Sequence, residues 1–116
     1  MKRFPAIAIA LAATACQSAA PPAAGAPVAL YQYAGSKQCE RVGKTLDALK
    51  QELSRAGVQV QSASCGQDGL MYAQGCGMPD GRILVMHVPQ GQAAMAVRLG
   101  LKPLRELPEA ASAPCR

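Results

Sequence analysis

The chain has 116 residues, of which 50% are hydrophobic, with a formal net charge of +5, five Cys, one His and no Trp. This length suits one domain and excludes a multi-domain enzyme, a polytopic membrane protein and a long coiled coil. Ala supplies 23 residues, 12 of them among the first 30, so the core is smaller than the hydrophobic fraction suggests. Domains with so small a core often need cross-links.

Residues 1–15 are typical of a bacterial export signal. Lys2 and Arg3 precede a short apolar stretch that ends in the small residues Ala-Thr-Ala at 13–15, a pattern recognised by signal peptidases. The stretch is far shorter than the roughly 20 residues that a spanning helix needs. Residues 11–16 resemble the lipobox of bacterial lipoproteins, which implies that Cys16 is lipidated and that residues 16–27, rich in Ala and Pro, form a tether. The alternative is plain secretion with Cys16 as a free thiol.

The first half of the remaining chain predicts a strand, a helix and a second strand. Residues 28–33 are rich in β-branched and aromatic side chains, which favours a strand. Within 42–56 the apolar residues recur at helical spacing, which predicts an amphipathic helix, and Gly57 follows as a stop signal. Residues 58–61 alternate between apolar and polar, as a half-buried strand does.

The second half predicts two more strands and a second helix. Residues 70–76 lie between two turn signals and are the weaker strand candidate, whereas 82–88 carry apolar groups on both faces and indicate a central strand. Residues 90–99 predict a short helix, and 108–116 an extended tail. The order predicts a small α+β domain over 28–107 with an antiparallel or mixed sheet of three to four strands and two helices on one face, akin to a ferredoxin-like sandwich.

Four segments of this domain also resemble a group of small proteobacterial envelope proteins, over residues 31–104. The segments are Ser-Lys-Gln-Cys-Glu at 36–40, Ala-Gly-Val-Gln-Val at 56–60, Cys-Gly-Gln-Asp-Gly at 65–69 and Cys-Gly-Met-Pro-Asp-Gly-Arg at 76–82. The resemblance implies a compact exported domain with cysteines in these places. It implies no activity, because the group has no agreed function.

Four cysteines follow the tether, namely Cys39, Cys65, Cys76 and Cys115. In an oxidising envelope they predict two disulfides, for which three pairings are possible. If one helix joins the first two strands, these strands run parallel and bring Cys39 and Cys65 to one end of the sheet. A strand over 70–76 would carry Cys76 about 20 Å away, towards Cys115. We therefore expect Cys39–Cys65 and Cys76–Cys115, whereas an irregular loop over 66–81 would favour Cys65–Cys76.

The sequence assembles no recognisable catalytic set. It lacks Cys-x-x-Cys and a Gly-x-Ser-x-Gly elbow, the signatures of thiol redox sites and serine hydrolases. Gly43-Lys44-Thr45 lacks the glycine five residues upstream that a phosphate loop requires, and Asp68 and Asp80 each precede Gly in a turn signal. His87 on an apolar strand is better explained by packing than by zinc binding. We predict no catalytic residue, no metal site and no cofactor.

These observations favour a lipid-anchored, non-catalytic envelope module that binds a protein, peptidoglycan or a small ligand. The expected location is the outer membrane, facing the periplasm, with a soluble periplasmic protein as the alternative. Without Lys2 and Arg3 the net charge is +3, and the charges alternate in sign, which argues against nucleic acid as a partner. The competing hypothesis is a small exported thiol or metal protein, or an enzyme, that uses Cys76 and His87.

Overall fold

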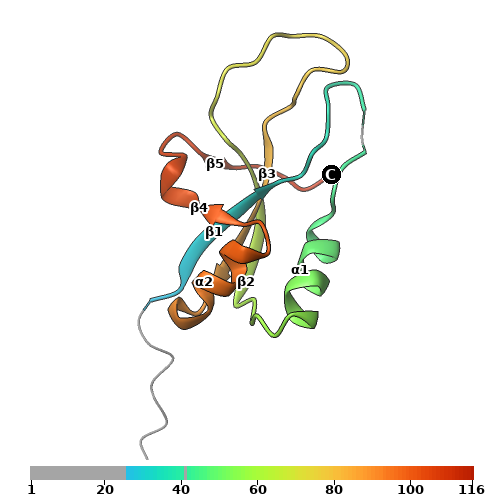
Figure 1. Cartoon of the computed structure of the whole chain (residues 1–116). Coiled ribbons are helices and arrows are strands. Elements are labelled where there is room, and N and C mark those ends of the chain that lie inside the picture. The colour runs from blue at the N-terminus through green and yellow to red at the C-terminus, as the bar shows by residue number, and fades with distance from the viewer. Residues whose placement is uncertain (1–25, 41) are drawn as a thin grey trace, which may run out of the picture.

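Five strands form one sheet in this computed structural model, which describes residues 26–40 and 42–116. The strand order is β4-β1-β3-β2-β5, and every neighbouring pair is antiparallel (Figure 1). The elements in chain order are β1 (Val28–Tyr33), α1 (Leu46–Arg55), β2 (Ser62–Gln67), β3 (Arg82–Val88), the 3₁₀ turn η1 (Gln90–Gln92), α2 (Ala93–Arg98), β4 (Lys102–Pro103), the 3₁₀ turn η2 (Leu104–Glu106) and β5 (Ala111–Ser112).

The connections form two interleaved split βαβ units. β1 and β2 are both antiparallel to β3, so they run parallel to each other with β3 between them and α1 as the crossover. In the same way β3 and β4 run parallel to each other, with β1 between them and α2 as the crossover. This βαββαβ order is that of a ferredoxin-like sandwich, which confirms the predicted α+β fold and the central position of residues 82–88.

The helix α1 begins later than the apolar spacing predicted. Thr45 is its N-cap, with a side-chain oxygen that accepts a hydrogen bond from the Ala48 amide at 3.1 Å, as capping residues do. Val42, expected in the first turn of this helix, is outside it and exposed. The expected helix over residues 42–56 is therefore shortened to Leu46–Arg55 at both ends.

The alternating residues 58–61 do not form a strand, because Val58 takes part in the hydrogen bonds that end α1. Gly57 has a φ of +83° and donates to the Ser54 carbonyl at 3.0 Å, while Val58 donates to the Leu53 carbonyl at 2.9 Å. These two bonds define a Schellman motif, in which the residues joined by the longer bond, here Leu53 and Val58, commonly make an apolar contact. Leu53 and Val58 are both buried in the core. The chain then pairs with β3 only from Ser62 onward.

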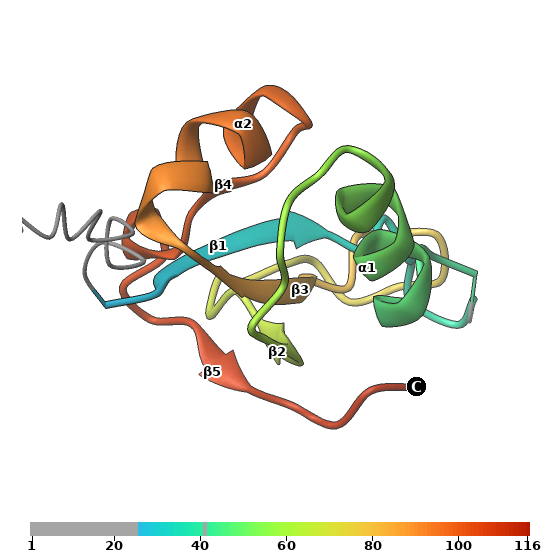
Figure 2. The same cartoon turned by 90° about the horizontal axis from the view of Figure 1, so that it is seen from below.

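Both helices cover one face of the sheet, as predicted (Figure 2). The larger core cluster lies between them and the sheet. Its buried members are Leu30, Leu49, Leu53, Val58, Leu84, Met86, Val88, Ala96 and Leu101. Alternation along β3 places its even-numbered residues on this inner face, because successive side chains of a strand point to opposite faces.

The outer face of the sheet is covered by the chain that follows β4. Tyr31, Ile83 and Val85 form a second buried cluster, against which Leu104, Leu107 and Ala110 pack. The sheet has five strands rather than three to four, because residues 102–112 add a two-residue strand at each edge. The segment expected as an extended tail thus reaches the sheet through β5, which pairs with Gly66 and Gln67 of β2.

Candidate binding surface

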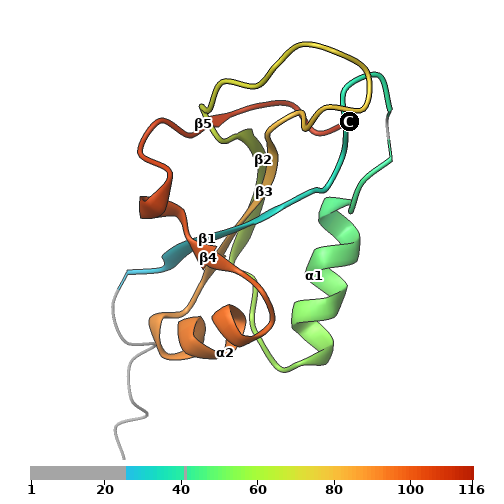
Figure 3. The same cartoon turned by 45° about the horizontal axis from the view of Figure 1, so that its top comes forward.

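Two loops lie together at the end of the sheet where β1 ends and β3 begins (Figures 1 and 3). One contains residues 34–40 and 42–45, and the other residues 68–81; together they are called the loop pair. No strand forms over residues 70–76, so the expected third strand of the domain is wrong. A connection of this length without regular structure is uncommon in a compact domain, and such loops are often functional.

A disulfide joins the two loops. Cys39 and Cys76 are bonded, with their Cα atoms 5.1 Å apart, and both residues are exposed. Cys39 has a φ of +67°, the one positive value for a residue other than Gly among the described residues. Such a conformation is unfavourable for a side chain with a Cβ atom, so the contacts around Cys39 must hold it.

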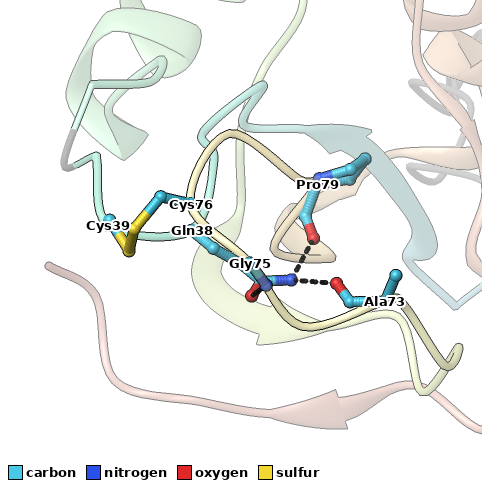
Figure 4. The surroundings of a disulfide bond; sticks show 6 residues. All are labelled: Gln38, Cys39, Ala73, Gly75, Cys76 and Pro79. Carbon is cyan, nitrogen blue, oxygen red and sulfur yellow. Dashed lines mark hydrogen bonds between the residues drawn. A yellow bond between two sulfur atoms is a disulfide. The ribbon is translucent and has the colours of Figure 1, made fainter.

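The side chain of Gln38 supplies many of those contacts (Figure 4). Its Nε2 donates to the carbonyl oxygens of Ala73 and Pro79 at 2.9 and 3.1 Å, and its Oε1 accepts from the Gly75 amide at 3.0 Å. The backbone of Gln38 also donates to the Met78 carbonyl at 2.8 Å. The longer loop has no regular strand, and the hydrogen bonds of the Gln38 side chain help to hold it against the shorter loop.

A buried carboxylate holds the start of the longer loop. Asp68 is 2% exposed, and its Oδ2 accepts hydrogen bonds from the hydroxyls of Tyr33, at 3.0 Å, and Tyr72. Its Oδ1 accepts from the Leu70 amide at 2.9 Å. The hydrogen bond to Asp68 and burial raise the pKa of Tyr72, and burial together with the bond to Asp68 raises that of Tyr33. Both phenols therefore stay protonated as donors well above neutral pH.

A second carboxylate fixes the other end of this loop. Asp80 accepts a hydrogen bond from the Ser36 hydroxyl at 2.6 Å and one from the Arg82 amide at 3.0 Å. Asp68 and Asp80 thus each accept hydrogen bonds that fix one end of the longer loop. A polar cleft of about 480 Å³ adjoins this point, bordered by residues that include Lys37, Glu40 and Arg82.

The longer loop presents apolar side chains to solvent. Met71 is 100% exposed, Leu70 is 55% exposed, and Met78 is also exposed. Exposed apolar side chains that lie together on a surface are candidates for contact with a partner. Sequence reasoning missed these residues because it placed Leu70 and Met71 in a candidate strand over residues 70–76.

The cysteine pairing expected from the sequence is wrong. The structure has Cys39–Cys76 and Cys65–Cys115, the second with Cα atoms 5.2 Å apart, and not Cys65–Cys76. β1 and β2 are parallel as expected, so Cys39 and Cys65 do lie towards the same end of the sheet. Because residues 70–76 form a loop, Cys76 returns to that end and meets Cys39. The C-terminal segment follows β5 along β2 and brings Cys115 to Cys65.

The residues of the competing thiol or metal hypothesis are not brought together. Cys76 is in the loop pair and disulfide-bonded, whereas His87 lies near the other end of β3. The described residues contain no group of three or more His, Cys, Asp or Glu that could hold a metal ion. The Nδ1 atom of His87 is buried and has no hydrogen-bond partner. This ring borders a pocket of about 160 Å³ between β2, β3 and the C-terminal segment.

The predicted export signal, the lipidation site Cys16 and most of the tether lie outside the described residues. Among residues 26–40 and 42–116, no helix has the length and apolar character needed to cross a bilayer. No protein-family model matches the chain. No curated protein and no solved structure matches it either.

Proposed function

We propose that this chain is a lipid-anchored, non-catalytic module of the cell envelope that binds another envelope protein through the loop pair. The observation that carries this proposal is the fully exposed Met71 on a loop that a disulfide and the Gln38 side chain hold in one conformation. Loops held on a rigid scaffold are the usual sites of recognition, and a surface fixed before binding loses less conformational entropy on association.

The proposed location rests on the signal pattern and on the cysteines. All four cysteines that follow Cys16 are disulfide-bonded, which is expected of proteins in an oxidising compartment such as the periplasm. A diacylglyceryl group on Cys16 would hold the chain stably on a membrane, where a single acyl chain would be marginal. The outer membrane, with the domain facing the periplasm, is the location that we propose.

A protein partner is favoured over peptidoglycan because of the apolar side chains of the longer loop. Peptidoglycan recognition would need exposed polar groups, whereas the longer loop exposes Leu70 and Met71. The loop pair also lies opposite the end of the sheet at which β1 begins (Figure 3). A tether that enters at Val28 would therefore leave these loops facing away from the membrane.

Photo-crosslinking in cells tests the binding site. A photoreactive amino acid in place of Met71 should crosslink to one saturable protein partner, and a further Leu70→Asp substitution should remove the product. The matched control is the same photoreactive residue in place of Gln51, which is exposed on α1. Equal products from both positions, or none from Met71, would contradict the proposed binding site.

Lipidation is tested separately. The protein should label with radioactive palmitate and partition into detergent, and Cys16→Ser should abolish both properties. A wild-type protein that stays unlabelled and soluble in the periplasm would contradict the anchor but not the binding site.

A further inference from the structure

The helix α2 exposes an apolar surface at the end of the sheet opposite the loop pair. Five of its six residues are apolar, and only Ala96 is buried. Met95 and Val97 are each 45% exposed, and Leu99, which caps the helix, is 41% exposed. A helix that is apolar on nearly all sides is usually buried on all sides. The exposed side of α2 therefore lacks a covering layer within the described part of the chain.

A basic residue accompanies this apolar surface. Arg98 lies three residues after Met95 and next to Leu99, so the three side chains share one face of the helix. Like Arg98, Lys102 and Arg105 are exposed, but Lys102 pairs with Tyr31 of the outer face and Arg105 lies in η2 beside it, so Arg98 is the basic residue on the α2 side. The sequence from Pro89 to Arg105 contains no acidic residue. None of these three forms a salt bridge among the described residues. The surface thus combines apolar side chains with unpaired positive charge.

The same surface lies where the tether enters the domain. Val28, the first residue of β1, is paired with Val88, the last residue of β3, and α2 begins only five residues later. Figures 1 and 3 show α2 beside the start of β1, with the loop pair at the far end. Val28 lies twelve positions after Cys16, a length that reaches at most about 40 Å when fully extended. The proposed anchor would therefore keep the start of β1, and α2 beside it, within that distance of the bilayer.

We infer that the tether-end surface, formed by Met95, Arg98 and Leu99 of α2, docks on a bilayer that contains anionic phospholipids. Apolar side chains enter the headgroup region while Arg98 pairs with phosphates, as in other interfacial helices. Each basic residue near an anionic surface strengthens binding about fivefold. This inference rests on the proposed function in one respect: the anchor at Cys16 would turn the end of the domain that carries α2 towards the membrane.

Tryptophan fluorescence tests this inference, because the chain has no Trp of its own. Both core clusters and both disulfides lie within residues 28–115, so a chain from residue 16 onward with Cys16→Ser keeps all of them and has no acyl group. Met95→Trp places a reporter on α2, and Met71→Trp places one on the loop pair as the matched control. Each protein is mixed with vesicles of phosphatidylcholine alone or with 30% phosphatidylglycerol.

The expected result is a blue shift of the Met95→Trp emission with anionic vesicles only, and no shift for Met71→Trp. Adding Arg98→Gln should weaken vesicle binding about fivefold. Equal shifts at both positions, or no shift at either, would overturn the inference. A blue shift without vesicles that grows with protein concentration would also overturn it, because a second copy would then cover α2. The tested protein carries no acyl chain, so its vesicle binding does not depend on whether Cys16 is lipidated, and the two proposals can fail separately.

Discussion

Removal of the Cys39–Cys76 disulfide measures how far the loop pair depends on its covalent link. The bond joins residues 37 apart in sequence, and the chain-entropy estimate for closing such a loop is about 4 kcal/mol of stabilisation. The unfavourable backbone of residue 39, with its φ of +67°, persists if the Gln38 hydrogen bonds keep the loop in place, so no strain is released. A loss of about 4 kcal/mol is therefore expected when the bond is removed, a large part of the roughly 5–15 kcal/mol typical of a domain.

Thermal unfolding followed by circular dichroism measures this loss. For a domain of this size each kcal/mol shifts the melting temperature by about 4–8 °C, so the variant with both Cys39→Ser and Cys76→Ser should melt roughly 16–32 °C lower. Each single substitution should have nearly the same effect as the pair, because one bond is lost in every case. A fall of less than about 5 °C would refute the reasoning, as would additive single effects.

A matched variant separates the disulfide from the backbone conformation. Cys39→Gly combined with Cys76→Ser also lacks the bond, but Gly adopts a positive φ without a steric penalty. If the Gln38 hydrogen bonds keep the loop in place, this variant should be about 1 kcal/mol more stable than the one with Ser at residue 39. Equal stability of the two would indicate that the loop rearranges once the disulfide is gone.

Three further predictions concern single residues. Gln38→Ala should lower the free energy of unfolding by about 2–3 kcal/mol, because three hydrogen bonds are lost; an unchanged urea midpoint would contradict this. The pKa of Tyr72 is raised above its unfolded value of 10.0, so its protonated phenol stabilises the fold below pH 10 and this stabilisation is lost as the pH rises through the folded-state value. Tyr72→Phe lacks this titration and should therefore lose less stability than the wild type between pH 8 and pH 11. Urea unfolding at these two pH values measures the difference, and equal losses would contradict the prediction. Gly69→Ala should destabilise more than Gly57→Ala, since both have positive φ but only at Gly69 would the new methyl group meet backbone atoms; equal melting temperatures would contradict this.

The inner layer of the fold could be predicted because its residues repeat with a clear period. Residues 82–88 alternate between two apolar faces, and this pattern is unusual outside a central strand. The apolar stripe of α1 likewise predicted which side of the helix is buried, and Leu49 and Leu53 are in the core. Because the spacing of apolar residues follows which side of an element is buried, the contributions of β3 and α1 to the larger core cluster were predicted correctly.

The outer layer could not be predicted because its residues have no period. Leu104, Leu107 and Ala110 cover Tyr31 and its neighbours from a segment in which Pro103 and Pro108 predict a tail without regular structure. The strands at the sheet edges have two residues each, too few for alternation to be recognised. The backbone pairing of β5 also needs Gly66, where a Cβ atom would lie 2.8 Å from the Ala111 carbonyl oxygen.

The candidate site depends on long-range contacts that local patterns do not report. Residues 58–61 and 70–76 both have strand-like composition, but the first continues the end of α1 and the second is held by Gln38 and Asp68. The hydrogen bond from the Gln38 side chain to Ala73, 35 residues away, cannot be recognised from the spacing of apolar residues or from the charge pattern. The error in the disulfide pairing followed from the same cause, since it rested on a strand that the loop replaces.

The topology places the two proposed surfaces as far apart as the sheet allows. β1 enters the sheet beside α2 and leaves it at the loop pair, so one strand connects the tether to the binding end. β3 spans the same distance with seven residues, about 20 Å at the rise of a strand. A ferredoxin-like order brings both crossover helices to one face and so leaves the two ends of the sheet free for other contacts. If the proposed anchor and both proposed surfaces are correct, this arrangement would let α2 dock on a bilayer while Met71 faces a partner at the other end of the sheet.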